Sequence, residues 1–125
     1  MNKLSNEYLN KCKNALAAEQ THSLSTTDNW AHVNRELVHQ DWDVLYTKLA
    51  EYADETAVDN VNVQTLMKEH FDIACRFYTP SKEAYIGMGI FYKDNEDMKK
   101  FHISYHPEMV EYLGDAIVHY ANNNL

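Results

Sequence analysis

The segment LMKEHFDIACRFYTPSKEAYIGMGIFY, from Leu66 to Tyr92, sets the organisation of the whole chain. It consists of two apolar stretches that meet at Thr79-Pro80-Ser81. In both stretches the large apolar side chains recur every three or four residues, which is the spacing of one face of an α-helix. We predict two helices here. The second begins with Thr79 as its N-cap and Pro80 as its first residue, a position where proline is well tolerated.

Glycine is used unusually in this sequence, because all three glycines fall inside helical patterns. Gly87 and Gly89 lie in the second helix of the segment, and Gly114 lies in the last helix of the chain. Each costs about 1 kcal/mol relative to alanine in a helix interior. Either a neighbouring helix packs closely at these positions or a ligand lies against the bare backbone. We expect Gly87 to line a ligand groove and Gly89 to serve helix packing.

The amino-terminal half is also helical in pattern. A modest amphipathic stripe predicts a helix from Ser5 to Glu19, and the polar residues Thr21–Thr27 read as a linker that ends in an N-cap. From Asp28 to Ala53 the pattern predicts one long helix. It carries two apolar stripes, so we expect it to be covered on more than one side and to be central.

The remaining residues continue the helical pattern. Asp54–Asn62 is an acidic loop whose Asn60 or Asn62 can cap the next helix, and a run of acids after Tyr92 favours the start of a short one. Pro107 is expected to begin the last helix. Period-two alternation is essentially absent. We therefore predict an all-α fold, a single domain over residues 1–125 built as a bundle of five to six helices.

Composition excludes several classes of function. The chain has 125 residues, 45% of them hydrophobic and 24% charged, with a net charge of -8. This charge disfavours nucleic acid and anionic membrane surfaces, since there is no basic cluster to displace phosphate counterions. No segment approaches the roughly 18 continuous apolar residues of a membrane span. The amino terminus lacks the apolar run of a signal peptide, so we expect a cytoplasmic protein.

Few residues suggest chemistry. Cys12 and Cys75 are far apart and are best interpreted as reduced, packed thiols rather than reactive ones. His102 and His106 have metal-ligand spacing, but the proline after His106 breaks the helix, which favours two solvated imidazoles. His70 lies on an apolar helix face, where a hydrogen-bonded core histidine is favoured over a ligand contact. We predict no enzyme activity, no metal and no cofactor.

Aromatic content is the feature that points to binding. The chain has nine tyrosines, four phenylalanines, two tryptophans and five methionines. Tyrosine joins an apolar ring to a polar tip, which suits a pocket for a bulky, partly polar ligand. An ordinary helical core is the alternative, and the helix glycines favour the pocket. The predicted ligand-binding residues are Trp30, His70, Phe77, Tyr78, Tyr85, Gly87, Met88, Tyr92, Tyr105, Met109 and Tyr112.

One further observation is an ordered set of residues in the second half of the chain: Ile73-Ala74, Tyr78, Glu83, Gly89, Tyr92, Glu96, Pro107, Tyr112 and Asp115-Ala116-Ile117. This set, in register without gaps, resembles the TipAS antibiotic-recognition domain, the carboxy-terminal half of certain MerR-type multidrug-responsive regulators. Thr27-Asp28-Asn29-Trp30 is similar to the start of that family's long helix, so the resemblance runs from Thr27 to the carboxy terminus.

The resemblance implies a compact, globin-like bundle with a deep hydrophobic groove for large antibiotics. Thiopeptides are ligands in the family, and albicidin-binding resistance proteins are similar to it. The family's thiopeptide-capturing cysteine corresponds to Gly87 here, so we expect non-covalent binding. Asn95, Met98 and Glu108 also depart from the family pattern, and we expect no DNA-binding helix-turn-helix before the domain.

Two functions of different classes follow. The first is a stand-alone domain that reversibly binds an amphipathic small molecule or peptide antibiotic. The second is a protein-interaction or regulatory domain that acts with a separate DNA-binding chain. Haem binding, suggested by a globin-like bundle containing His70, is a weaker third. We also expect residues 1–25 to form a helix and linker that close over the groove as a lid, with Tyr8 and Leu9 or Cys12 facing the ligand.

Overall fold

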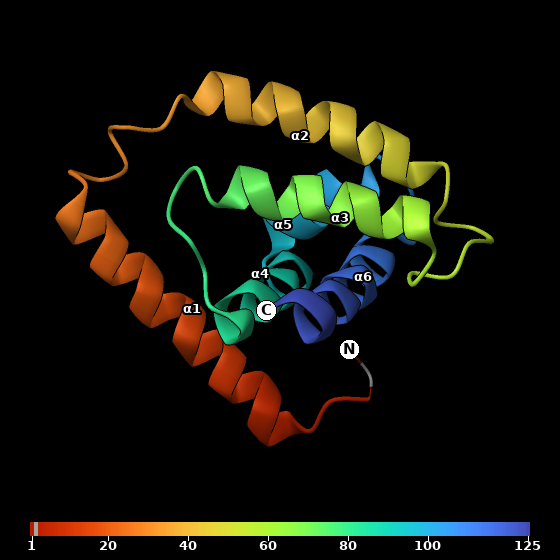
Figure 1. Cartoon of the computed structure of the whole chain (residues 1–125), viewed down its shortest axis with the longest axis horizontal. Helices are drawn as coiled ribbons and strands as arrows, with labels where there is room; N and C mark the ends of the chain where they lie inside the picture. The colour runs from red at the N-terminus through yellow and green to blue at the C-terminus, as the bar shows by residue number, and fades with distance from the viewer. Residues whose placement is uncertain (2) are drawn as a thin grey trace.

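Six α-helices make up the fold, as seen in a computed structural model of the chain (Figure 1). The structure describes residue 1 and residues 3–125, and this part of the chain contains no β-strand. The prediction of an all-α bundle is confirmed. The helices are α1 (Asn6–Thr26), α2 (Arg35–Ala50), α3 (Val61–Ala74), α4 (Lys82–Asp94), α5 (Glu96–Ile103) and α6 (Met109–Asn124).

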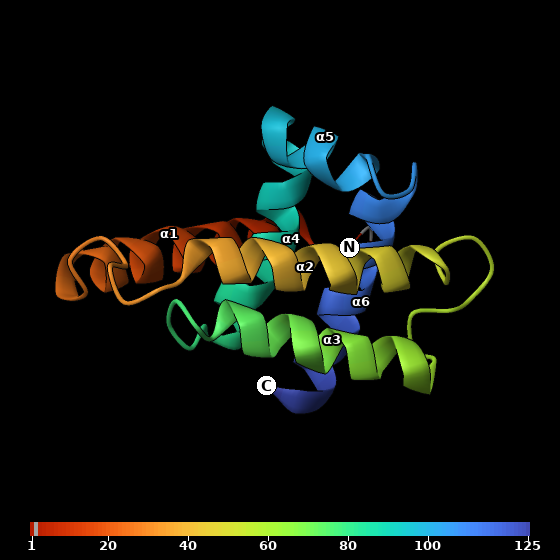
Figure 2. The ribbon, with the colours of Figure 1, turned by 90° about the horizontal axis from the view of Figure 1, so that it is seen from above.

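Helix α4 is the centre of the molecule, since α1, α5 and α6 all pack against it. Helix α2 packs on α3, and α3 packs in turn on α6. Figures 1 and 2 show α1 and α2 along the outside of the bundle. On α2, Leu37 and Val44 are 46% and 54% exposed. The prediction that Asp28–Ala53 forms the central helix is wrong, because one face of α2 stays in contact with solvent.

Helix α1 is longer than predicted, because Thr21–Thr27 is not a linker. The hydroxyl groups of Ser25, Thr26 and Thr27 donate to backbone carbonyls three or four residues earlier, at oxygen–oxygen distances of 2.7, 3.2 and 2.6 Å. Serine and threonine can bond back to the helix in this way instead of ending it. The helix that was expected to stop at Glu19 therefore continues to Thr26.

The loop between α1 and α2 replaces the predicted beginning of the long helix. Asp28, Asn29 and Trp30 have φ angles of 52, 57 and 62°, in the left-handed region. Aspartate and asparagine tolerate this region better than most residues, and three such residues in a row end any right-handed helix. Helix α2 then begins at Arg35, with Asn34 as its N-cap.

The start of α3 is as predicted and the start of α4 is not. Asn60 caps α3, and its side chain accepts from two backbone N–H groups of the first turn. In α4 the N-cap is Ser81 rather than Thr79, since the Ser81 hydroxyl accepts from the backbone N–H three residues later. Pro80 consequently precedes the cap instead of opening the helix, and α4 begins two residues later than expected, at Lys82.

The last two helices differ from prediction only at their ends. Asn95 caps α5, and two acidic residues occupy its first turn as expected. Helix α6 begins at Met109, two residues after Pro107, because a turn closed by the Met109 N–H and the His106 carbonyl comes first. At the other end α6 continues to Asn124.

All three glycines lie inside helices, as predicted, and two of them mark close approaches between helices. A Cβ on Gly87 would lie 2.5 Å from the backbone oxygen of Cys12 and 2.9 Å from the Cβ of Leu16. Helix α1 therefore rests directly on α4, which buries Cys12 and Leu16 almost completely. Gly89 faces α6, where a Cβ would lie 3.5 Å from the Cα of Gly114. Burial of the facing helices offsets the helix cost of these glycines.

Candidate functional site

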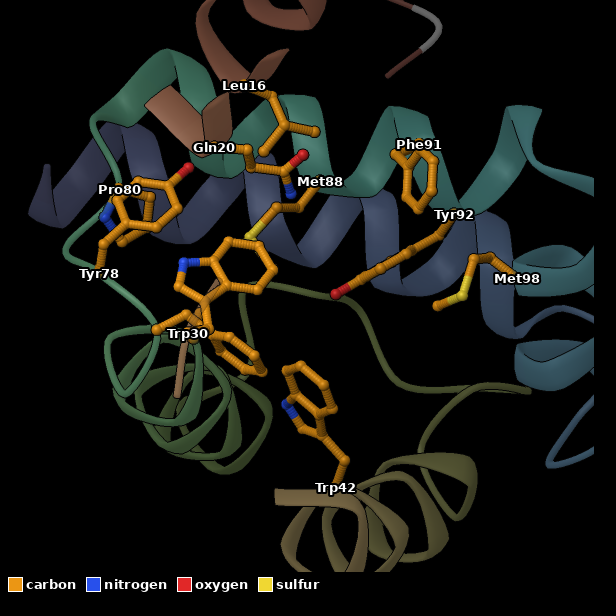
Figure 3. A pocket seen from close by; sticks show the side chains of 12 residues that line it. Leu16, Gln20, Trp30, Trp42, Tyr78, Pro80, Met88, Phe91, Tyr92 and Met98 are labelled. Carbon is orange, nitrogen blue, oxygen red and sulfur yellow. The ribbon is translucent and has the colours of Figure 1, made fainter. Parts of the chain in front are cut away.

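A pocket with a volume of about 150 Å³ lies where α1, α3 and α4 meet the loop before α2 (Figure 3). Every helix except α6 contributes at least one side chain to it. The pocket is thus assembled from segments that are far apart in the sequence. The residues that line it are Leu16, Gln20, Trp30, Trp42, Ala74, Phe77, Tyr78, Pro80, Met88, Phe91, Tyr92 and Met98.

Three aromatic rings form one wall of the pocket. Trp30 meets Phe77 edge to face, with ring centroids 4.9 Å apart, and Trp42 lies nearly parallel to Phe77 with centroids 6.1 Å apart. Trp30 is held in place because its indole N–H donates to the Ser23 hydroxyl at 2.9 Å. Aromatic rings in these arrangements are favourable partners for a further planar group. The left-handed loop thus brings Trp30 to the end of α3.

The lining carries no charged side chain and only a few polar atoms. The Trp42 indole N–H and the Tyr78 hydroxyl are buried and have no hydrogen-bond partner among the described residues. Burial, with a smaller contribution from the Glu19 carboxylate, raises the pKa of Tyr78 to about 12. The Tyr78 hydroxyl therefore keeps its proton at neutral pH. The remaining polar groups of the lining residues are the amide of Gln20, the Tyr92 hydroxyl and the Trp30 indole N–H.

A buried chain of hydrogen bonds lies behind the pocket. It joins Tyr85 to His70 Nδ1 at 2.8 Å, His70 Nε2 to Tyr46 at 3.1 Å, and Tyr46 to His102 Nε2 at 3.2 Å. His102 Nδ1 then reaches the Met98 carbonyl at 2.6 Å. Both imidazoles are almost inaccessible to solvent. This chain of hydrogen bonds joins residues of α4, α3, α2 and α5, and it satisfies polar groups that would otherwise be costly to bury.

The direction of every bond in this chain follows from its last acceptor. The Met98 carbonyl can only accept, so His102 Nδ1 carries a proton and, in the neutral ring, His102 Nε2 accepts from the Tyr46 hydroxyl. Tyr46 has one hydrogen, so its oxygen must accept from His70 Nε2–H. His70 Nδ1 then accepts from the Tyr85 hydroxyl. With both rings neutral, one arrangement of protons satisfies these bonds.

The pKa directions agree with neutral histidines. Burial, and then the neighbouring His102, lowers the pKa of His70 to about 3. Burial also lowers the pKa of His102, although its bond to the Met98 carbonyl opposes this. Burial raises the pKa of Tyr46 and Tyr85 well above the ordinary value. All four groups are therefore uncharged at neutral pH.

Two pocket residues rest directly on this chain. Trp42 stacks on His70 with ring centroids 6.0 Å apart, and Tyr92 stacks on His102 with centroids 4.3 Å apart. Met98 belongs to both the pocket and the hydrogen-bonded network, since its side chain lines the pocket and its carbonyl accepts from His102. The back wall of the pocket is thus positioned by a buried polar network, and movement of either histidine would move an aromatic wall.

The structure brings together five of the residues predicted as ligand-binding: Trp30, Phe77, Tyr78, Met88 and Tyr92. His70 and Tyr85 lie behind the wall as members of the hydrogen-bonded chain, and Gly87 lies under α1 instead of at the pocket. The interpretation of His70 as a hydrogen-bonded core histidine is confirmed.

The other predicted residues lie elsewhere in the molecule. Tyr105 donates to the Asp43 carboxylate at 2.7 Å, and Tyr112 donates to the Thr56 carbonyl at 2.8 Å. Met109 is fully buried in the core. In the folded protein Tyr105 contacts α2, Tyr112 contacts the loop after α2, and Met109 faces the interior, so none of the three reaches the pocket.

Seven lining residues were not predicted. Trp42 and Phe91 belonged to apolar helix stripes, and their aromatic rings were the signal that could have identified them. Leucine, alanine, proline and methionine are common core residues, so no sequence pattern distinguishes a lining position from an ordinary one. The unpredicted residues are Leu16, Gln20, Trp42, Ala74, Pro80, Phe91 and Met98.

His102 and His106 were expected to be two solvated imidazoles, and this prediction is wrong for His102. His102 is 1% exposed within the hydrogen-bonded chain, while His106 lies 2.7 Å from the Asp54 carboxylate. In residues 1 and 3–125 no three His, Cys, Asp or Glu side chains come together as a metal site would require. Cys12 and Cys75 are both free, and neither lines the pocket.

Comparison with known proteins identifies the family. No curated protein and no solved structure matches the chain. No helix in the described part of the chain is long and apolar enough to cross a membrane. The family model of the TipAS antibiotic-recognition domain matches residues 5–120. This match reaches beyond the resemblance from Thr27 onward and includes α1, so the chain belongs to the TipAS antibiotic-recognition domain family.

Proposed function

We propose that this domain binds a bulky, amphipathic antibiotic reversibly in the pocket between α1, α3 and α4, and that it acts as a binding domain rather than as an enzyme. Membership of an antibiotic-recognition family supports ligand binding in general. The pocket geometry supports this particular place on the chain. The domain would then sequester its ligand, or sense it, without changing it chemically.

The observation that carries the proposal is the composition of the pocket wall. Six of its twelve residues are aromatic, two are methionines, and none is charged. Ligand sites are typically concave and apolar, with a few polar groups that orient the bound molecule. Methionine adapts to irregular shapes, so Met88 and Met98 suit a wall that must fit a complex molecule.

The size of the pocket indicates how a large molecule would be held. A cavity of about 150 Å³ accommodates roughly one benzene-sized ring, whereas drug-sized ligands occupy about 300–1,000 Å³. A bulky antibiotic would therefore insert one ring and lie across the rim, or it would displace part of α1. Phe91 lines the pocket and is 44% exposed, so it is the aromatic residue best placed at the rim.

The absence of a nucleophile from the lining supports reversible binding. Neither cysteine lines the pocket, and burial raises the pKa of both the Cys12 and the Cys75 thiol. The thiolate is the reactive form of cysteine, so a raised pKa leaves little of it at neutral pH. Binding energy in this pocket would come from apolar contact, aromatic stacking and hydrogen bonds.

Calorimetric titration with a thiopeptide and with an albicidin-like compound tests the proposal. A matched pair of variants locates the site: Phe91→Ala removes an exposed ring that lines the pocket, and Phe101→Ala removes one that does not (44% and 38% exposed). We expect Phe91→Ala to weaken binding about tenfold and Phe101→Ala to leave it unchanged. Equal affinities in the two variants would place the ligand elsewhere. No binding by either compound would contradict the proposed function.

A further inference from the structure

Two buried hydrogen-bond donors of the pocket wall have no partner in the part of the chain that the structure describes. Three buried side-chain atoms lack one among the described residues: Trp42 Nε1, Tyr78 Oη and Gln64 Oε1. The first two belong to residues that line the pocket. Gln64 lies far away at the beginning of α3, where its amide nitrogen donates to the Val58 carbonyl at 2.7 Å. Buried polar groups without a hydrogen-bond partner are rare in folded proteins, and each one requires an explanation.

The chemistry of these two groups specifies what would satisfy them. An indole N–H can only donate, so Trp42 requires an acceptor. The Tyr78 hydroxyl keeps its proton, because burial and the Glu19 carboxylate raise the pKa of Tyr78 to about 12, and it too can donate. Figure 3 shows the two side chains approaching the pocket from different sides. Because both residues line the pocket, a molecule inside it is bounded by two residues whose buried donors lack partners.

The charges around the pocket restrict further which chemical group can enter it. No lysine, arginine or histidine lines the pocket, so an anion inside it would have no cation to pair with. The nearby Glu19 carboxylate, which accepts from the Ser81 backbone N–H at 3.0 Å, adds a negative charge on the Tyr78 side. An unpaired ion in an apolar pocket is strongly disfavoured. The inserted group must therefore offer lone pairs without carrying a negative charge.

Shape indicates a flat ring. The volume of about 150 Å³ is close to that needed for a single six-membered aromatic ring. The neighbouring walls are the rings of Trp30, Trp42 and Phe77, two of them nearly parallel at an angle of 14°. Aromatic groups pack favourably against such faces and edges.

We infer that the pocket recognises an uncharged aryl group bearing a hydrogen-bond acceptor, which accepts from Trp42 Nε1–H and Tyr78 Oη–H. The inference rests on the proposed function, since it names the part of the ligand that enters the pocket. It makes Trp42 and Tyr78 the residues that determine specificity. The aromatic rings select a flat apolar body, the two donors select its acceptor, and the uncharged lining rejects carboxylates.

Three small probes of similar size separate these requirements: acetophenone, ethylbenzene and benzoate. The first is an uncharged aryl ketone, the second lacks an acceptor, and the third carries a negative charge. We expect acetophenone to bind the whole domain at least about tenfold more tightly than either of the others, as measured by chemical-shift titration. Equal binding of acetophenone and ethylbenzene would overturn the inference, and so would tighter binding of benzoate.

The indole signals report on the hydrogen bond itself. The chain has two tryptophans, and the Trp30 N–H already donates to Ser23, so the Trp30 signal is an internal control. On adding acetophenone to ¹⁵N-labelled protein, the Trp42 indole proton should move downfield while that of Trp30 stays near its position. Ethylbenzene should not produce the downfield shift. An unmoved Trp42 proton at saturating acetophenone would contradict a hydrogen bond to Trp42.

Tyr78→Phe removes the second donor and keeps the ring. It should reduce the preference for acetophenone over ethylbenzene to about threefold or less while leaving the melting temperature unchanged or higher, since an unmet hydroxyl is lost. Tyr112→Phe is the matched control, because it removes a hydroxyl that donates to Thr56 outside the pocket. It should lower the melting temperature and keep the preference. An unaltered preference in Tyr78→Phe would remove Tyr78 from the proposal.

The experiments distinguish failure of the inference about the aryl group from failure of the proposed antibiotic-binding function. If the antibiotics bind and depend on Phe91 while no probe binds, the inference is overturned and the proposed function stands. If a probe binds as expected and no antibiotic does, the pocket chemistry stands and the antibiotic role does not.

Discussion

A Cβ placed on Gly87 would lie 2.5 Å from the carbonyl oxygen of Cys12, so the backbones of α4 and α1 meet there without a side chain between them. A backbone atom cannot rotate away as the end of a flexible side chain can. The position of α1 in this structure therefore depends on glycine at residue 87. Because α1 supplies Leu16 and Gln20 to the pocket, the same contact also determines the shape of the site.

Replacing Gly87 with alanine should destabilise the fold by about 1–3 kcal/mol, which is typical of overpacking. Gly114→Ala is the matched control, since the three atoms nearest to a Cβ there all belong to the flexible Met1 side chain, at 3.3–3.6 Å. That variant should be neutral or slightly stabilising, because alanine favours the helix. Urea unfolding measures both. If Gly87→Ala is as stable as the unaltered protein, α1 does not rest on α4 as described.

Ligand binding should not form a covalent adduct with the protein. From the resemblance to the family, Gly87 is expected at the position of its capturing cysteine, and an added Cβ there would lie 2.5 Å from the Cys12 carbonyl oxygen. Cys12 is fully buried, and burial raises the pKa of the Cys75 thiol. Intact-mass measurement after incubation with a dehydroalanine-containing thiopeptide should therefore show the unmodified chain. An adduct mapped to Cys75 would show that this thiol had taken over the role.

Stability should fall as the pH is lowered from about 7 to 5. The pKa of His70 is lowered to about 3 in the folded protein, against about 6.5 in an unfolded chain, and that of His102 is lowered as well. Between these values the unfolded chain takes up protons that the folded protein does not. The free energy of unfolding should then decrease by up to about 1.4 kcal/mol per pH unit for each histidine.

Urea unfolding at pH 7, 6 and 5 measures this slope. His70→Gln should make it shallower, whereas His39→Gln, which removes an exposed imidazole, should leave it unchanged. The two variants separate the buried histidine from the general effect of losing an ionisable group. A free energy of unfolding that stays level between pH 7 and 5 would mean that both buried imidazoles titrate as they do in water.

Helix α1 should open more readily than the rest of the bundle, and ligand should close it. It packs mainly on α4, so it can detach without separating α4 from α6. Most of the stability of a helix in a protein comes from the packing of its apolar face, so the order of α1 depends on that docking. We expect the amides of α1 to exchange faster than those from Leu45 to Leu49, and to slow when ligand binds. Equal protection without ligand would identify α1 as a permanent part of the core.

The turns of α1 that reach the pocket differ from those expected. Leu16 and Gln20 line the pocket, whereas Tyr8, Leu9 and Cys12 were expected to face the ligand. The difference follows from the length of the helix. Because hydroxyl side chains carry α1 on to Thr26, the pocket lies against its later turns.

Much of the fold could be predicted from the sequence, because local patterns carry it. The three- and four-residue spacing of apolar side chains predicts the helices, and side chains such as Asn60 mark their beginnings. The aromatic content indicated a pocket, and Phe77, Tyr78 and Met88 were predicted as lining residues and lie there. These features depend on residues that are close together along the chain.

Tertiary structure alone decided which residues meet. Nothing local distinguishes Gly87, which lies under α1, from a glycine that lines a pocket, since both are glycines on an apolar helix face. Nor does spacing reveal that His102 would be buried against Tyr46, because its partner comes from a helix more than fifty residues earlier. Contacts between distant segments depend on how whole helices pack, and packing is a property of the assembled surfaces rather than of any one stretch.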